Sequence, residues 1–262
     1  MLYRRIEQKC GNIARSIMVR TLTKKLPLYV INEYPKSGGT WLGLMFAEAI
    51  GVPFPRNKFP VLKTSIVHGH YLRREGMSNV VLVWRDGRDV MVSWYHHCLF
   101  KNERMNAALV KRVRKELKFE NYEDVKTNFP AFMEYSFTMQ MRPHFSWAEF
   151  VRAWYGLDEV IYVRYEDLRR ETVSELQRVV MVLTGQMLEY QAAAEIAEHF
   201  SFYKQAGREA GVERKNSFMR KGVVGDWVNY FSREAREVFD HYAGEELVLL
   251  GYEKDRMWTI GL

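Results

Sequence analysis

The stretch from Tyr34 to Trp41 reads Tyr-Pro-Lys-Ser-Gly-Gly-Thr-Trp and directly follows a short apolar run, Leu28–Tyr34. Pro35 favours extended backbone in the residue before it, so this run is predicted to form a strand. The next segment, Thr40–Ile50, has the pattern of a helix that ends at Gly51. Backbone N–H groups and the helix dipole converge where a strand passes into a helix, so the loop between them is well suited to bind an anion.

The side chains of this loop are of the types that bind phosphate groups. Glycines let the backbone approach phosphate oxygens closely, while the hydroxyls and the lysine add hydrogen-bond donors. The loop is not a Walker A motif, because no G-x-x-x-x-G-K-[ST] occurs in the chain and the lysine precedes the glycines. We therefore expect a P-loop-like anion site whose members are Lys36, Ser37, Gly38, Gly39, Thr40 and Trp41.

Strand-like and helix-like segments alternate along the rest of the chain. Further strands are expected over Val61–Tyr71, Val80–Arg85 and Val160–Tyr165. The expected helices span residues 87–99, 147–155, 172–183 and 232–250. Strands separated by helices imply a central parallel sheet with helices on both faces, which is an α/β fold.

The length and composition favour a single globular domain. No repeat or low-complexity linker divides the 262 residues, so we expect one domain over residues 28–262 after an N-terminal arm over residues 1–27. At 47% hydrophobic and 27% charged, the chain is neither disordered, collagen-like nor a coiled coil. Residues 100–145 are weakly patterned, and we expect a mobile region over a site there.

The cysteines and the apolar runs point to an intracellular protein. Cys10 and Cys98 are too few for a disulfide framework or a cysteine-based metal site. No apolar run approaches the roughly 20 residues that span a bilayer. The expected location is therefore cytoplasmic, with contact at a membrane surface as a further possibility.

That possibility arises from the net positive charge, because most of the excess of cations over acids lies in the N-terminal arm. The net charge is +7, and residues 1–28 carry seven cations against Glu7 alone, which leaves about +1 for the rest. A near-neutral body argues against nucleic acid as a partner. The arm has an apolar stripe at helical spacing, formed by Leu2, Ile6, Cys10, Ile13 and Ile17. Either this helix packs on the body with a solvated basic face, or residues 1–25 lie on an anionic membrane.

Four segments, in this order, resemble the sulfotransferases that use 3′-phosphoadenosine-5′-phosphosulfate (PAPS). The loop resembles the family's Y-P-K-S-G-T-T-W, with Gly39 in place of a threonine. Residues Val81–Tyr95 resemble the segment that binds the 3′-phosphate, and Tyr162–Leu168 contains the Y-E-D-[LM] pattern. Residues Phe218–Trp227 nearly match F-x-R-K-G-x-x-G-D-W. The resemblance spans about residues 28–250.

The resemblance implies PAPS as the co-substrate, 3′,5′-ADP as the product and no metal. It places the 3′-phosphate against Arg85, Ser93 and the Arg220–Gly222 segment, and Arg offers this phosphate bidentate donors. It places the adenine between Trp41 and Phe202, with Tyr165 nearby. Outside the loop, the implied nucleotide-binding residues are Arg85, Ser93, Tyr165, Phe202, Met219, Arg220, Lys221 and Gly222.

The expected mechanism needs a cation at the leaving group and a general base. Lys36 is expected to stabilise the bridging oxygen, Ser93 to help place that lysine, and Lys63 to support it. The family pattern has a histidine at the end of K-T-H, but this chain reads Lys-Thr-Ser from Lys63. His70 and His68 follow within one strand-like stretch and point to the same face. We predict His70 as the base, with His68 as the alternative.

The acceptor and two rival functions stay open at this stage. An aromatic content of 14% favours the hydroxyl or amine of a small, apolar or lipid-like acceptor. One alternative is a P-loop-type nucleotide kinase or NTPase, which shares the strand–loop–helix phosphate site. The other is a non-catalytic basic module that binds membrane or RNA through the arm. The oligomeric state is open, a homodimer included.

Overall fold

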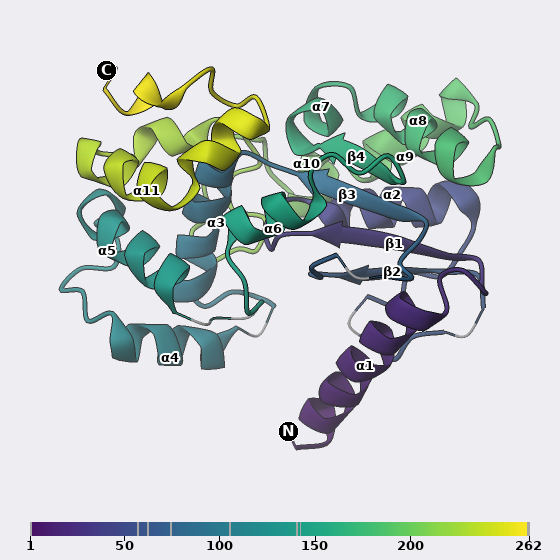
Figure 1. The fold of residues 1–262 in the computed structure, drawn as a ribbon, viewed down its shortest axis with the longest axis horizontal. Coiled ribbons are helices and arrows are strands. Elements are labelled where there is room, and N and C mark those ends of the chain that lie inside the picture. Colours follow the sequence, from purple (N-terminus) through teal and green to yellow (C-terminus); the bar gives the residue numbers. More distant parts are fainter. Residues whose placement is uncertain are drawn as a thin grey trace. The chain divides into compact units, whose positions relative to one another are not determined.

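The computed structural model describes residues 2–56, 58–61, 63–73, 75–104, 106–139, 141 and 143–260, with side chains from Cys10 onward. The chain gathers into two compact units, which we describe separately (Figure 1). The first unit comprises Met1–Arg85 and Ala153–Gln205, and the second comprises Asp86–Arg152 and Ala206–Leu262.

The first unit is built on a four-stranded sheet in the order β2-β1-β3-β4. All of its neighbouring strands are parallel, and Ile31 lies opposite both His68 and Val81. The strands are β1 (Leu28–Glu33), β2 (Ser65–Gly69), β3 (Val80–Trp84) and β4 (Val160–Arg164). Their carboxyl ends therefore meet at one edge of the sheet. The predicted α/β class and the parallel sheet flanked by helices are confirmed, while the strand expected over Val61–Tyr71 is shorter, at five residues.

One face of this sheet carries a continuous apolar core. Ile31, Val81 and Val163 project from three strands and pack against α2 (Gly39–Ile50), α8 (Thr172–Thr184) and α9 (Tyr190–His199), which Figure 1 draws together. The short helix α7 (Tyr165–Arg170) follows β4 directly and adds Leu168 to the same core. The unit closes with α10 (Phe202–Ala206). Period-two alternation puts these strand residues on one face, and the helices exclude water from it.

The N-terminal helix α1 (Leu2–Thr21) exists as expected, but it buries a different face. Ile13 and Ile17 of the predicted stripe are 62% and 55% exposed, whereas Arg15 is only 4% exposed. The Arg15 guanidinium is satisfied by the Lys58 carbonyl and the Asn12 side chain, which explains how a cation can face inward. Side chains of the stripe before Cys10 lie outside the described residues. Within the part of the chain that the structure describes, no helix is both long and apolar enough to cross a bilayer.

The second unit is helical. Its helices are α3 (Gly87–Leu99), α4 (Ala107–Glu116), α5 (Val125–Thr138), most of α6 (Trp147–Trp154) and α11 (Arg233–Leu249), with short turns η1 (Asp226–Asn229) and η2 (Arg256–Thr259). Residues 100–145, for which the sequence predicted a mobile region over a site, contain α4 and α5. Phe129 and Phe132 of α5 are fully buried and pack edge-on against Tyr95 of α3. This segment is therefore part of the second unit's core.

Candidate functional site

The loop between β1 and α2 has the backbone of an anion-binding turn. Lys36 and Gly38 have φ values of 76° and 100°, both in the left-handed region. The Trp41 N–H donates to the Gly38 carbonyl at 2.9 Å, which starts α2 and leaves helix N–H groups directed at the loop. A Cβ at Gly38 would lie 2.5 Å from Cδ2 of Tyr165, so only glycine fits there. The loop thus combines a helix N-terminus with a close approach of bare backbone.

Four cationic side chains surround or belong to this loop. Arg85, which follows β3, donates from Nη1 to the Lys36 carbonyl at 2.9 Å and lies 4.3 Å from the Tyr165 ring centroid. Arg56 donates from Nη2 to the Thr40 hydroxyl at 3.3 Å. The Arg169 guanidinium is 5.6 Å from the Trp41 ring. The sequence predicted Lys36 and Arg85, but it gave no signal for Arg56 or Arg169.

The predicted adenine-binding aromatics all belong to this unit. The Trp41 indole N–H donates to the Phe200 carbonyl at 2.8 Å, which fixes the ring. Tyr165 presents its edge to Trp41 at a centroid separation of 6.2 Å. Phe202 is buried at the start of α10, two residues after that carbonyl. The structure therefore brings Trp41 and Tyr165 together beside the loop and holds Phe202 close in sequence to the group that anchors Trp41.

Both candidate histidines contact one acidic residue that the sequence analysis missed. Nε2 of His68 lies 2.9 Å from Oε1 of Glu33, the last residue of β1. Nδ1 of His70 lies 2.8 Å from the backbone carbonyl of Glu33. The two imidazole rings are 5.3 Å apart, and Phe54 contacts His68 edge-on at 6.1 Å. The histidines do share one face, whereas Lys63 is exposed ahead of β2.

The environment of this group shifts two pKa values. Burial lowers the pKa of His70, an effect that the charge of His68 strengthens and the Glu33 carboxylate opposes. Burial by itself raises the pKa of Glu33, but the hydrogen bonds and charges of the histidines and the Gly39 N–H bring it below its ordinary value. Glu33 is therefore ionised and His70 neutral near pH 7. A neutral imidazole beside an ionised carboxylate is suited to accept a proton.

The second unit holds the remaining predicted residues on α3 and on the segment before η1. Asp89 of α3 accepts the N–H groups of Gly225 and Trp227 at 2.8 and 2.9 Å. These bonds fix the segment that contains Met219, Arg220, Lys221 and Gly222 against the helix that carries Ser93. Three residues after Ser93, the His96 ring contacts Tyr230 at 6.1 Å, and the Tyr230 hydroxyl accepts from Nη1 of Arg220 at 3.2 Å.

Arg220 and Lys221 are bound to carboxylates. Arg220 pairs with Glu213 and Asp226, and Nζ of Lys221 lies 2.6 Å from Oδ1 of Asp226. Burial lowers the pKa of Arg220, but its two carboxylate partners raise it overall. Arg220 is therefore charged, and a phosphate that binds Arg220 or Lys221 must share it with these carboxylates.

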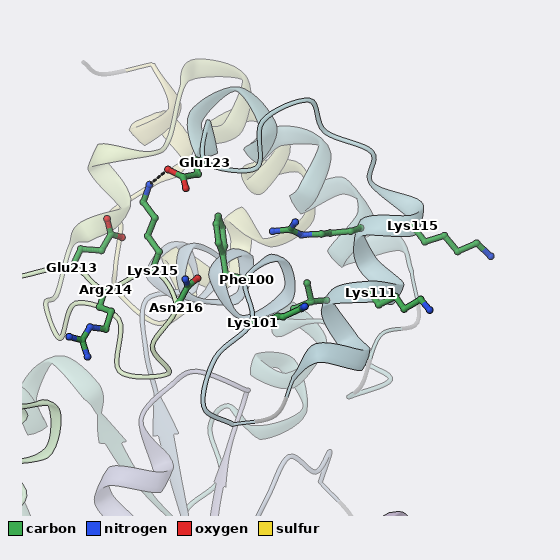
Figure 2. A pocket seen from close by; sticks show the side chains of 11 residues that line it. Phe100, Lys101, Lys111, Lys115, Glu123, Glu213, Arg214, Lys215 and Asn216 are labelled. Carbon is green, nitrogen blue, oxygen red and sulfur yellow. Dashed lines mark hydrogen bonds and ion pairs between the residues drawn. The ribbon is translucent and has the colours of Figure 1, made fainter. Parts of the chain in front are cut away.

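A cavity of about 1100 Å³ lies in the second unit, and Glu213, the partner of Arg220, is one of its lining residues. Figure 2 shows its basic lining, with Lys215 bonded to Glu123 at 3.0 Å. The charged residues of the lining are Lys101, Lys111, Arg114, Lys115, Arg214, Lys215, Glu123 and Glu213. This lining differs from the aromatic pocket expected for an apolar acceptor, and we assign the cavity no part in the reaction.

The comparisons with known proteins agree with this arrangement of loop and sheet. Residues 68–251 match the family described as the sulfotransferase domain, and the chain belongs to that family. Its relatives include sulfotransferase 1B1 of Mus musculus, 25% identical over 80% of this chain and 79% of the relative. Sulfotransferase 1E1 of Homo sapiens is 27% identical over 81% of each chain. The chain is accordingly an enzyme of the sulfotransferase class.

Two solved structures share the fold. The mouse sulfotransferase SULT7A1, complexed with PAP, superposes with a TM-score of 0.65 over 93% of this chain and 92% of its own, at 18% identity. Retinol dehydratase, in complex with androsterone and the inactive cofactor PAP, gives a TM-score of 0.54 over 84% of this chain and 80% of its own, at 18% identity.

Proposed function

We propose that this protein transfers the sulfuryl group of PAPS to a hydroxyl or amine of a small acceptor. The observation that carries the proposal is the loop at the carboxyl edge of the sheet, where the Arg85 guanidinium is bonded to the Lys36 carbonyl. Ligands of open parallel sheets bind at such edges, outside the carboxyl ends of the strands. The PAP in the two related structures supports the nucleotide assignment.

The residues of the loop fit a phosphosulfate. The hydroxyls of Ser37 and Thr40 are donors for its oxygens, and Lys36 supplies positive charge. Trp41, Tyr165 and Phe202 are assigned to the adenine. For the 3′-phosphate, the proposal uses Arg85 of the first unit. Ser93, Met219, Arg220, Lys221 and Gly222 belong to the second unit, and their assignment to the nucleotide stays a prediction from sequence.

The proposed reaction needs one proton transfer and one stabilised leaving group. The acceptor oxygen attacks sulfur while the bond from sulfur to the bridging oxygen breaks, and 3′,5′-ADP leaves with the negative charge. Lys36 stabilises that charge, with Ser93 and Lys63 in supporting roles. His70 takes the acceptor's proton at Nε2, because Nδ1 already carries the proton that it donates to the Glu33 carbonyl. His68 is the alternative base.

The proposed acceptor is small and apolar. Phe54, packed on His68, supplies an apolar wall beside the proposed base. Androsterone, the ligand in the retinol dehydratase complex described above, is of this chemical kind. A cytoplasmic location is part of the same proposal. A panel of hydroxylated and amine acceptors with PAPS, assayed by release of 3′,5′-ADP, tests this assignment.

The nucleotide assignment predicts a thermal shift. We expect 3′,5′-ADP without Mg²⁺ to stabilise the protein by about 2.7 kcal/mol at 100 times its Kd. For a chain of this size, each kcal/mol raises the Tm by about 2–4 °C. Differential scanning fluorimetry with 3′,5′-ADP, 5′-AMP and ATP with Mg²⁺ separates the alternatives. A larger shift with ATP and Mg²⁺ than with 3′,5′-ADP would instead support the kinase or NTPase reading.

A second candidate function concerns α1 and an anionic membrane surface. Ile13 and Ile17 are more than half exposed on one side of the helix, with the exposed cations Arg20, Lys24 and Lys25 close in sequence. Exposed apolar side chains beside an excess of positive charge are complementary to the interface of an anionic bilayer. This surface would be additional to sulfuryl transfer.

The membrane candidate predicts selective vesicle binding. We expect the protein to sediment with phosphatidylserine-containing vesicles and not with phosphatidylcholine alone. The double variant Ile13→Glu/Ile17→Glu should lose at least about tenfold in partitioning, because burial of each isoleucine contributes about 1.5–3 kcal/mol. Tyr190→Glu, at a similarly exposed apolar site on α9, is the matched control. Equal sedimentation of both variants would remove this candidate.

A further inference from the structure

Glu33 joins parts of the site that are far apart in the sequence. Its Oε2 accepts the Gly39 N–H at 2.6 Å, at the first residue of α2. Its Oε1 lies 2.9 Å from Nε2 of His68, and its backbone carbonyl lies 2.8 Å from Nδ1 of His70. A single buried residue, 4% exposed, therefore bonds to both histidines and to the start of the helix behind the loop.

The Glu33 carboxylate also determines which residue can occupy position 39. A Cβ added at Gly39 would lie 2.8 Å from Cδ of Glu33 and 3.1 Å from its Cγ and Oε1. Gly39 begins a helix and does not have a positive φ, so space rather than backbone conformation requires glycine there. The threonine of the family pattern would therefore require the Glu33 side chain to move from its present position. The replacement of the family's threonine by Gly39 is thus structurally linked to the presence of Glu33.

We propose that Glu33 is a positioning residue for sulfuryl transfer, which fixes the histidine pair against the phosphosulfate loop and supplies negative charge behind it. This inference rests on the proposed function. A backbone carbonyl only accepts hydrogen bonds, so Nδ1 of His70 carries the proton and Nε2 keeps its lone pair. When Nε2 takes up the acceptor's proton, the nearby carboxylate stabilises the imidazolium that forms.

The charge balance of this cluster gives a direct signature. The groups that face Glu33 are the two imidazoles of the β2 strand and its extension, and the Gly39 N–H. With the carboxylate ionised, the histidine pair can hold one proton and leave the buried cluster without net charge. Without the carboxylate, that first proton makes the cluster cationic. The carboxylate opposes the effect of burial on the pKa of His70, so His70 takes up its proton at lower pH when the charge of Glu33 is removed.

Glu33→Gln tests the role, because the amide keeps the shape and an oxygen for the Gly39 N–H. We expect NMR titration of the His70 imidazole to show its proton bound at lower pH, and kcat to fall by about 10²-fold with little change in the KM for PAPS. The control is Glu48→Gln on helix α2, where an exposed glutamate lies 3.2 Å from Nδ1 of His199. An unchanged titration of His70, or a kcat equal to that of the control, overturns the proposal.

A double-mutant cycle tests the link to the loop. Gly39→Ala alone should weaken binding of 3′,5′-ADP, whereas in a Glu33→Ala background the added methyl group has room and should have little further effect. Additive effects overturn the link. A wild-type protein that neither binds 3′,5′-ADP nor transfers sulfuryl refutes the proposed function, and the role of Glu33 with it. An active wild type with an unaffected Glu33→Gln refutes the role of Glu33 alone.

Discussion

Replacing Lys36 by alanine is expected to lower the kcat of sulfuryl transfer by about 10²–10³-fold, the usual cost of removing one preorganised donor. Negative charge develops on the bridging oxygen as the bond to sulfur breaks. An ammonium that the loop already holds in place stabilises that charge more in the transition state than in the bound substrate, so the loss falls mainly on kcat. Binding of 3′,5′-ADP, which the proposal assigns to Arg85 as well as to the loop, should weaken less.

The backbone at this position allows a clean comparison of two variants. Lys36 has a φ of 76°, and the guanidinium of Arg85 donates to its carbonyl. Alanine has the same left-handed penalty as lysine, about 1–2 kcal/mol, whereas glycine has none. Lys36→Ala and Lys36→Gly both remove the ammonium but differ in backbone strain. Equal, large losses of kcat in both variants therefore assign the effect to the side chain.

The measurement is steady-state kinetics with the acceptor found in the panel, together with the 3′,5′-ADP thermal shift. Lys204→Ala is the matched control, because Lys204 is an exposed lysine of α10 in the same unit. If Lys36→Ala retains more than about a tenth of the wild-type kcat, another group stabilises the leaving oxygen. If only the glycine variant is active, the backbone of the loop matters more than the charge.

The loop and the sheet could be predicted from sequence because their signals are local. Strands such as Val80–Trp84 are continuous apolar runs, and a proline and two glycines mark the passage from Leu28–Glu33 into α2. Parallel strands end at one edge of the sheet, which explains why Arg85 after β3 reaches the Lys36 carbonyl after β1.

The role of Glu33 could not be predicted, because it depends on which strands are neighbours. Period-two alternation puts His68 and His70 on one face, but only the pairing of β1 with β2, with Ile31 opposite His68, brings Glu33 to them. A charged residue at the end of a buried strand was a visible signal. From sequence, Gly39 indicated only the loss of the threonine hydroxyl of the family pattern. In the structure, the absence of a side chain at Gly39 makes room for the Glu33 carboxylate.

Periodicity also failed where tertiary partners decide burial. On α1 the helix turns Arg15 inward because the Lys58 carbonyl is available to it, and leaves Ile13 exposed. In α5, Pro130 lies inside the helix and obscured the helical pattern, although its neighbour Phe129 is fully buried. The error on α1 arises because hydrophobic spacing does not state which surface covers a helix.

Replacing His70 by asparagine is expected to lower kcat by about 10²–10⁴-fold, the range that general base catalysis contributes. The asparagine amide can still donate to the Glu33 carbonyl as Nδ1 of His70 does, but it has no basic nitrogen for the acceptor's proton. The variant therefore separates proton transfer from local structure. His68→Asn should lose less activity, because Nε2 of His68 is engaged by the Glu33 carboxylate.

The pH dependence provides a second and independent readout. Only a neutral imidazole accepts a proton, so kcat must fall as the pH drops through the pKa of the base. Burial lowers the pKa of His70, so the acidic limb of the wild-type profile should have its midpoint below about 6.5, the ordinary histidine value. In His70→Asn that limb should disappear. His199→Asn, on the surface of α9, should leave both the limb and the rate unchanged.

These measurements also decide between the two histidines. If His70→Asn keeps both its rate and its acidic limb while His68→Asn loses them, then His68 is the base and His70 only anchors the chain to β1. In that case Nε2 of His68 carries the proton that it donates to the Glu33 carboxylate, and Nδ1 of His68 is the basic nitrogen. Glu33 contacts whichever imidazole accepts the proton, so Glu33→Gln should lower kcat under either assignment.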